Sequence, residues 1–184
     1  MHPNTLRLGE SLLLIVDVQE AFRQSIPRFA RLTENIVRFT AGAKALNLPV
    51  LVTEQYPKGL GHTATEIADV LPADAAIIEK TAFSSCGAAA FNDKLVPIGA
   101  KQIIIAGIEA HICVNQTAHD LLALGYQVHL LSDAIASRTA ENEQIAFAKM
   151  RESGAILSSV EMALFELMRD AKHEQFKLIQ KLIK

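Results

Sequence analysis

The expected fold follows from one stretch of the sequence, Ile103-Ile104-Ile105-Ala106-Gly107-Ile108-Glu109-Ala110-His111-Ile112-Cys113-Val114. It begins as an unbroken apolar run of strand length, breaks at Gly107, and continues with helical spacing through Ala118 and Leu121. A short strand that is apolar on both faces and leads into a helix is typical of a buried parallel strand in an α/β sheet. Since ligands of such sheets bind beyond the carboxyl ends of the strands, this strand–helix junction is expected to face a binding site.

Cys113 falls in the first turn of the helix that leaves this edge. Backbone N–H groups and the positive end of the helix dipole at that position lower the pKa of a thiol and favour an anion. The position makes Cys113 a candidate nucleophile, while a buried structural cysteine is the alternative.

The rest of the chain repeats the alternation of strand and helix. Further apolar runs of strand length lie at 11–16, 50–53, 75–78, 126–131 and 155–157, and helical patterns lie at 33–47, 64–70, 88–95, 141–152 and 160–169. The alternation predicts the α/β class: a three-layer α/β/α sandwich, Rossmann-like, with a six-stranded, mainly parallel sheet. Right-handed crossovers would place helices on both faces of the sheet.

Length and composition favour one globular domain over residues 1–184, because the chain has 184 residues, half of them hydrophobic, and no linker or repeat. Its C-terminal tail, 171–184, has Phe176, Ile179, Leu182 and Ile183 on one stripe. This amphipathic helical tail is expected to pack on the body of the protein or on a second subunit.

Charge and targeting signals narrow the class of partner and the compartment. The net charge of −2 gives no reason to expect a nucleic acid or an anionic membrane as partner. The two cysteines cannot form a disulfide framework, and the first ten residues lack the layout of a signal peptide. The sequence therefore favours a cytoplasmic protein that acts on a small molecule.

Three chemically suited groups leave three different strands at the same predicted edge. Asp17 follows the run at 11–16, Lys80 follows the run at 75–78, and Cys113 follows the run at 103–106. Asp17 could accept the proton of the thiol, and Lys80 would favour the ionised forms of the thiol and the carboxylate. The competing interpretations are a capping or surface ion-pair role for Asp17 and an ordinary solvated lysine for Lys80.

Loops at this edge supply candidates for the substrate pocket. They are the polar or aromatic residues nearest to the strand ends, namely Gln19, Phe22, Gln55, Tyr56, Phe83 and Ser84. His62, in the loop 54–63, is either a ligand for metal or substrate or a solvated side chain.

Three segments resemble the signature segments of the isochorismatase-like cysteine hydrolases, and closest to them the small single-domain members. The segments are Leu14-Ile15-Val16-Asp17-Val18-Gln19-Glu20-Ala21-Phe22, Glu79-Lys80-Thr81-Ala82-Phe83-Ser84 and Gly107-Ile108-Glu109-Ala110-His111-Ile112-Cys113-Val114. The resemblance implies a catalytic triad of Asp17, Lys80 and Cys113, and subunits that assemble as a homo-oligomer. It also implies a non-proline cis peptide at Ile108–Glu109 that aims the N–H groups of Glu109 and Cys113 at one oxyanion.

Two departures from the family's patterns limit the expected chemistry. Thr53-Glu54-Gln55-Tyr56-Pro57 lacks the Asp-x-His metal motif that nicotinamidases of this family carry, so we expect neither a metal nor another cofactor. Family members that cleave isochorismate do so without a cysteine nucleophile, so Cys113 favours amide or related acyl chemistry.

The sequence thus favours a cysteine-dependent hydrolase of a small amide or related carbonyl compound, working through a thioester intermediate. The alternative is a catalytically silent oligomeric scaffold or binding protein of the same fold. A dinucleotide-binding oxidoreductase is excluded because Asp17-Val18-Gln19 stands where a Gly-x-Gly-x-x-Gly turn would be needed.

Overall fold

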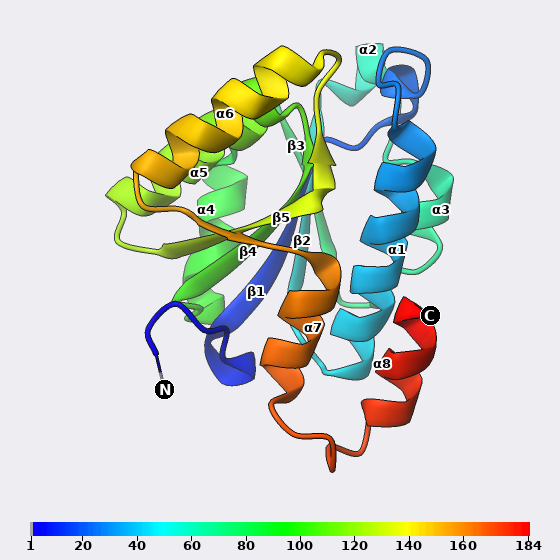
Figure 1. The fold of residues 1–184 in the computed structure, drawn as a ribbon. Coiled ribbons are helices and arrows are strands. Elements are labelled where there is room, and N and C mark those ends of the chain that lie inside the picture. Colours follow the sequence, from blue (N-terminus) through cyan, green and yellow to red (C-terminus); the bar gives the residue numbers. More distant parts are fainter. Residues whose placement is uncertain (1) are drawn as a thin grey trace.

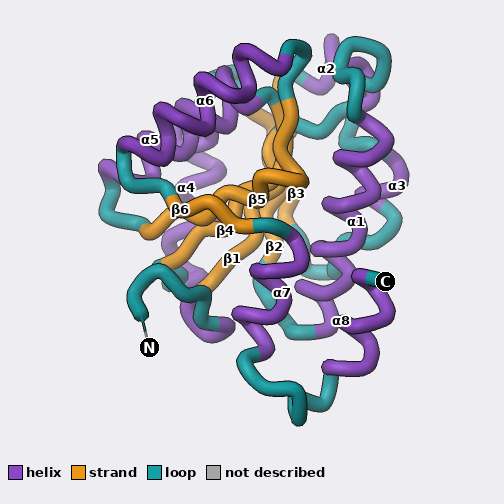
Figure 2. Tube along the Cα trace, viewed as in Figure 1, coloured by secondary structure: helices purple, strands orange, loops and turns teal. Residues whose placement is uncertain are grey.

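A six-stranded sheet in which every strand pair is parallel forms the centre of the protein (Figures 1 and 2). The structure is a computed structural model that describes residues 2–184. In chain order the strands are β1 (Ser11–Val16), β2 (Val50–Gln55), β3 (Ala76–Lys80), β4 (Gln102–Ile108), β5 (Gln127–Ala136) and β6 (Ile156–Ser158). In space they are arranged β3-β2-β1-β4-β5-β6, so the chain reverses its direction of travel across the sheet between β3 and β4. The predicted α/β class and six-stranded sheet are confirmed.

Two layers of helices cover the sheet (Figure 1). One face carries α1 (Phe29–Ala45), α3 (Thr65–Ala68), α7 (Val160–Met168) and α8 (Phe176–Ile183), and the other carries α4 (Ala89–Ile98), α5 (Asn115–Ala123) and α6 (Ala140–Glu152). The shorter helical pieces are η1 (Leu8–Glu10), η2 (Glu20–Phe22), α2 (Pro57–Leu60), η3 (Ser85–Gly87) and η4 (Ala110–Val114). None of the helices within residues 2–184 combines the length and the apolar composition that a membrane crossing requires.

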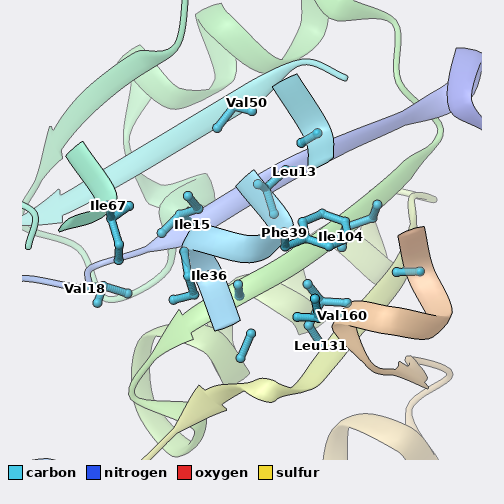
Figure 3. Close-up of a cluster of buried hydrophobic side chains, with 14 of the residues drawn as sticks. Leu13, Ile15, Val18, Ile36, Phe39, Val50, Ile67, Ile104, Leu131 and Val160 are labelled. Carbon is cyan, nitrogen blue, oxygen red and sulfur yellow. The ribbon is translucent and has the colours of Figure 1, made fainter. Parts of the chain in front are cut away.

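Each face of the sheet has its own apolar core, because successive side chains of a strand point to opposite sides. On the α1 face, Leu13 and Ile15 of β1 and Ile104 of β4 lie beside Ile36 and Phe39 of α1 (Figure 3). On the other face the alternate residues of the same strands join a second buried cluster, which also contains the side chain of Cys113. Burial on both faces is why β1 and β4 consist of unbroken apolar runs.

Most elements differ from their predicted ranges by a few residues, and three of these differences matter for the fold or the site. Helix α1 begins at Phe29, four residues before the predicted start at 33, and Thr33 lies inside the helix with its hydroxyl donating to the carbonyl of Ala30. The predicted helical tail 171–184 is helical at Phe176–Ile183, where Ile179 is buried and α8 contacts α1 and α7. Strand β5 continues to Ala136, five residues past its predicted end, and this extension changes which residues reach the carboxyl edge.

Candidate active site

The three predicted catalytic residues meet at the carboxyl edge of the sheet. Asp17 follows β1 directly, Lys80 is the last residue of β3, and Cys113 lies in η4, a single π-helical turn between β4 and α5. Their exposed fractions are 1%, 4% and 7%, so all three are removed from bulk water. Burial of a carboxylate, an ammonium and a thiol at one edge is expensive unless the groups interact with one another.

Backbone conformation and close packing restrict which residues fit at the carboxyl ends of β1 and β4. Asp17 adopts the left-handed conformation, with φ of 54°, and its N–H donates to the carbonyl of Thr53 on β2. Gly107, paired with Val16 on the neighbouring strand, has φ of 129°, and a Cβ placed on it would lie 2.1 Å from the carbonyl oxygen of Val16. Only glycine fits there, so Gly107 allows β4 to lie against β1 directly beside Asp17.

Asp17 and Lys80 form a buried ion pair. The Nζ of Lys80 donates to Oδ2 of Asp17 at 2.7 Å, and the hydroxyl of Thr53 donates to Oδ1 at 2.7 Å. Lys80 also donates to Oε1 of Gln55 at 2.7 Å and to the carbonyls of Ala82 and Phe83 at 3.1 and 3.0 Å. Four oxygens around one ammonium fix its position, which in turn holds the carboxylate of Asp17 in one orientation.

The environment of Cys113 corrects one prediction. Burial, followed by the negative charge of Asp17, raises the pKa of the Cys113 thiol to about 12, although Lys80 acts in the opposite direction as expected. The predicted lowering by the helix terminus is therefore wrong for the free protein, because the packing around η4 removes the sulfur from water. At neutral pH the resting group is a thiol beside a carboxylate.

The turn before Cys113 holds a second buried carboxylate. The peptide bond between Ile108 and Glu109 is cis, and the Glu109 side chain is 5% exposed. Its Oε2 accepts two hydrogen bonds from Arg138, one from the backbone N–H and one from Nε, both at 3.0 Å. These two bonds fix the position of the Arg138 side chain near the turn that carries Cys113.

Cys113 opens into a cavity of about 200 Å³. The residues that line it lie at or after the carboxyl ends of β1 to β5 and are Asp17, Phe22, Gln55, Leu60, Phe83, Ile108, Glu109, Ile112, Cys113 and Arg138. Apolar side chains form most of the wall, and the charged groups are Asp17, Glu109 and Arg138. Such a volume suits a compound of a few heavy atoms.

Three of the predicted pocket residues, Phe22, Gln55 and Phe83, line this cavity. Phe83 is 54% exposed, so it stands at the mouth. Gln55 also donates from Nε2 to the carbonyl of Thr81, which ties the end of β2 to the loop after β3.

The other three predicted pocket residues lie outside the cavity lining. Gln19 is completely buried, because its side chain accepts from the N–H of Gln55 and donates to the carbonyls of Gln55 and Gly61. Tyr56 lines a neighbouring hollow of about 440 Å³, and Ser84 accepts from the N–H of Cys86. The side chains of Gln19 and Ser84 bind backbone groups of the surrounding segments, and this use cannot be predicted from sequence position alone.

Leu60, Ile112 and Arg138 also line the cavity, and none of the three is predicted from the sequence. Arg138 was missed because β5 was expected to end at 131. With its actual end at Ala136, Arg138 lies two residues beyond the carboxyl end of a strand, in the same kind of position as the other site residues.

His62, considered as a ligand, pairs instead with Glu54. Its Nδ1 donates to Oε2 of Glu54 at 3.0 Å, and this carboxylate raises the pKa of His62. Within residues 2–184, no three side chains of His, Cys, Asp or Glu lie close enough together to hold a metal ion.

Comparisons with known proteins agree with this architecture. The family model for the isochorismatase domain matches residues 11–162. Isochorismatase domain-containing protein 2 of Danio rerio is 41% identical over 94% of this chain and 86% of its own, and the secreted isochorismatase effector Isc1 of Phytophthora sojae is 39% identical over 98% and 90%. The solved structure of MAR1 ribonuclease from Caenorhabditis elegans superposes with a TM-score of 0.93 and 38% identity, covering 97% of this chain and 92% of that one. The chain belongs to the isochorismatase family and carries its hydrolase fold.

Proposed function

We propose that this protein is a cysteine hydrolase that cleaves a small amide or related carbonyl compound. The single observation that carries the proposal is the convergence of Cys113 and Asp17 on one small cavity, with Lys80 bound to the back of Asp17. A thiol, a base and a fixed cation are the groups that acyl transfer through a thioester requires.

The acylation step follows from the resting protonation state. Substrate enters with its carbonyl carbon facing the sulfur, and the Asp17 carboxylate accepts the thiol proton as the C–S bond forms. The high pKa of Cys113 means that attack and proton transfer proceed together, because a free thiolate would be costly in this site. The backbone N–H groups of Glu109 and Cys113 are proposed to receive the oxyanion.

Acylation is completed when the amine leaves, and deacylation then repeats the proton transfer to Asp17 with water in place of the thiol. Asp17 returns the proton to the leaving amine, the C–N bond breaks, and an acyl thioester remains on Cys113. Asp17 then accepts a proton from an incoming water molecule whose oxygen attacks the thioester carbon. The acid is released when the sulfur recovers the proton. Lys80 takes no part in these proton transfers, and the four oxygens around its ammonium keep it in place.

The decisive experiment compares the two cysteines of the chain. We expect Cys113→Ala to lose at least about a thousandfold in turnover against a panel of small amides and esters, because no other group can form the acyl intermediate. Cys86→Ala is the matched control, since Cys86 lies in a different groove between α4 and α5. Turnover that survives in Cys113→Ala would exclude the nucleophilic role.

A trapped intermediate would identify the acyl group. Asp17 serves both the attack of the thiol and the activation of water, so the intermediate is sought in the protein with Asp17 intact. Rapid acid quenching after mixing with an activated ester, followed by intact-mass measurement, is expected to show an adduct on Cys113. An RNA oligonucleotide belongs in the same panel because the Caenorhabditis elegans relative is called a ribonuclease. Here a cavity of about 200 Å³ with largely apolar walls favours a small molecule over a polyanionic strand.

The alternative of a catalytically silent scaffold is tested by the same panel and by the oligomeric state. Tyr56, Ile77 and Phe83 are about half exposed around β3, and such apolar surface is typical of an association face. A homo-oligomer is therefore part of the proposal, and light scattering coupled to gel filtration checks it. An oligomer with no turnover and no adduct on Cys113 favours the scaffold.

A reducing compartment such as the cytoplasm also belongs to the proposal, because the mechanism needs Cys113 as a thiol. The Phytophthora sojae relative is described as secreted, so cell fractionation with an antibody is the direct check.

A further inference from the structure

One charged group in the cavity is not used by the proposed mechanism. Among the described residues that line the cavity, Arg138 is the one with a positive charge. Lys80 lies behind Asp17, and its three N–H groups are shared among four protein oxygens. The guanidinium of Arg138 is therefore the positive charge that a ligand in the cavity can contact.

The guanidinium is anchored on one side and open on the other. Nε and the backbone N–H of Arg138 both donate to the carboxylate of Glu109, so these bonds fix one side of the guanidinium. Within residues 2–184, neither Nη group has a hydrogen-bond partner, and the side chain is 55% exposed. The two Nη groups form the edge of the guanidinium that binds a carboxylate with two parallel hydrogen bonds.

The rest of the wall defines what lies between Arg138 and the sulfur. Phe22, Leu60 and Ile112 are apolar, and the cavity is too small for an extended chain. A compound that fits has a scissile carbonyl at one end, an anionic group at the other, and a short apolar stretch between them. A neutral amide of the same size offers no charge to the two Nη groups, which would keep water as their partner.

From this geometry we infer that the substrate is a small carboxylate-bearing amide, and that Arg138 binds its carboxylate and so determines specificity. The inference rests on the proposed function for the scissile end of the substrate. The position of Arg138 beside Glu109 has a purely structural interpretation as well, namely neutralising a buried carboxylate. A structural role would affect charged and neutral ligands equally, and this difference makes the two interpretations separable.

Alkylation of Cys113 tests the inference without any turnover. Iodoacetate and iodoacetamide differ in one group, carboxylate against amide, and both alkylate thiols. In a Cys86→Ala background, we expect iodoacetate to be favoured over iodoacetamide at Cys113 relative to glutathione, with a rate that saturates. Arg138→Gln should lower this preference by about tenfold to a hundredfold, the effect of one lost charge-assisted interaction. Arg138→Lys should retain part of it.

The matched control is Arg151→Gln, which removes an exposed arginine of α6 outside the cavity lining. It should leave the preference unchanged. Equal preference in Arg138→Gln and in the parent protein, or a parent preference no greater than that of glutathione, overturns the inference.

A binding measurement separates this inference from the proposed function. Calorimetry with Cys113→Ala should show succinamate binding and no binding of neutral succinamide, and adding Arg138→Gln should abolish the former. If this pattern holds while the wild type hydrolyses neither compound, the proposed function fails and the anion site stands. If the wild type hydrolyses neutral amides and Arg138→Gln lowers both classes equally, the hydrolase stands and the inference fails. Absence of alkylation by either reagent, together with no succinamate binding, also overturns it.

Discussion

The two edges of the sheet both bury polar side chains, and they use them differently. At the carboxyl edge the buried groups are charged, with Asp17 and Lys80 paired beside the thiol of Cys113. At the amino edge the buried groups are neutral, and Gln102 and His129 are both 0% exposed.

At the amino edge a hydrogen-bond network surrounds the side-chain amide of Gln102. Oε1 of Gln102 accepts from the N–H of Arg7 and the hydroxyl of Ser11, and its Nε2 donates to the carbonyl of Thr5 and to Gln127. These bonds attach the N-terminal segment to the starts of β1, β4 and β5. The network is structural, because its amide groups neither gain nor lose a proton.

Burial pushes a titratable group toward its neutral form at both edges. It lowers the pKa of His129 to about 4, with Arg7 contributing, and it raises the pKa of Cys113 to about 12. The difference lies in the neighbours. Cys113 has a carboxylate beside it that can accept its proton, whereas His129 has an amide oxygen of Gln127 at 3.2 Å. A buried neutral group can give up its proton during a reaction only where a proton acceptor is buried beside it.

Of the substitutions that test this difference between the two edges, Lys80→Met is expected to lower the free energy of unfolding the most. Removing the ammonium leaves the carboxylate of Asp17 buried without its partner, which costs about 3–5 kcal/mol in free energy of unfolding. Urea denaturation at pH 7 measures it. Lys101→Met is the matched control at the amino edge, because Lys101 is 71% exposed and pairs with Glu10 at 3.3 Å on the surface. Similar losses for both lysines would contradict a special role of the buried pair.

The second prediction concerns the pH dependence of stability at the amino edge. Unfolded, His129 titrates near 6.5, and folded it titrates near 4, so the unfolded state binds the extra proton between these values. Stability is therefore undiminished above pH 6.5 and falls by about 3 kcal/mol as the pH drops to 4. Urea midpoints from pH 7.5 to 4 check this, and His129→Leu should remove that part of the slope. An unchanged slope in the variant would show that other groups cause it.

The smallest effect is expected from Thr53→Val. It removes the hydroxyl that donates to Oδ1 of Asp17 and costs about 1–2 kcal/mol in free energy of unfolding, because a buried carboxylate loses a donor. Thr40→Val is the control, since the buried hydroxyl of Thr40 has no hydrogen-bond partner within residues 2–184. That variant should be neutral or stabilising in the same unfolding experiment, and a cost equal to that of Thr53→Val would contradict the assignment.

The sequence predicted the sheet and the meeting of Asp17, Lys80 and Cys113 because strand runs that are apolar on both faces are unambiguous and parallel strands end at one edge. It underestimated β5 because polar Ser132 and Asp133 interrupt the apolar run, although the strand continues through them to Ala136.

Properties that depend on packing were less predictable. The pKa of Cys113 depends on how closely the neighbouring turns cover the sulfur, and this is a property of the assembled fold. In the same way, the position of Gln19 predicted a contact with substrate, yet its side-chain amide is hydrogen-bonded to the backbone of Gln55 and Gly61.

The position of β3 at the edge of the sheet makes the site sensitive to local unfolding. Lys80 is the last residue of a strand that pairs on one side only, with β2. Edge strands fray before the centre of a sheet melts, and amide hydrogens in β3 are therefore expected to exchange faster than those of β1 and β4. Each local opening of β3 separates the ammonium of Lys80 from Asp17. Heat or mild denaturant should therefore disrupt this ion pair while the other five strands keep their native pairing.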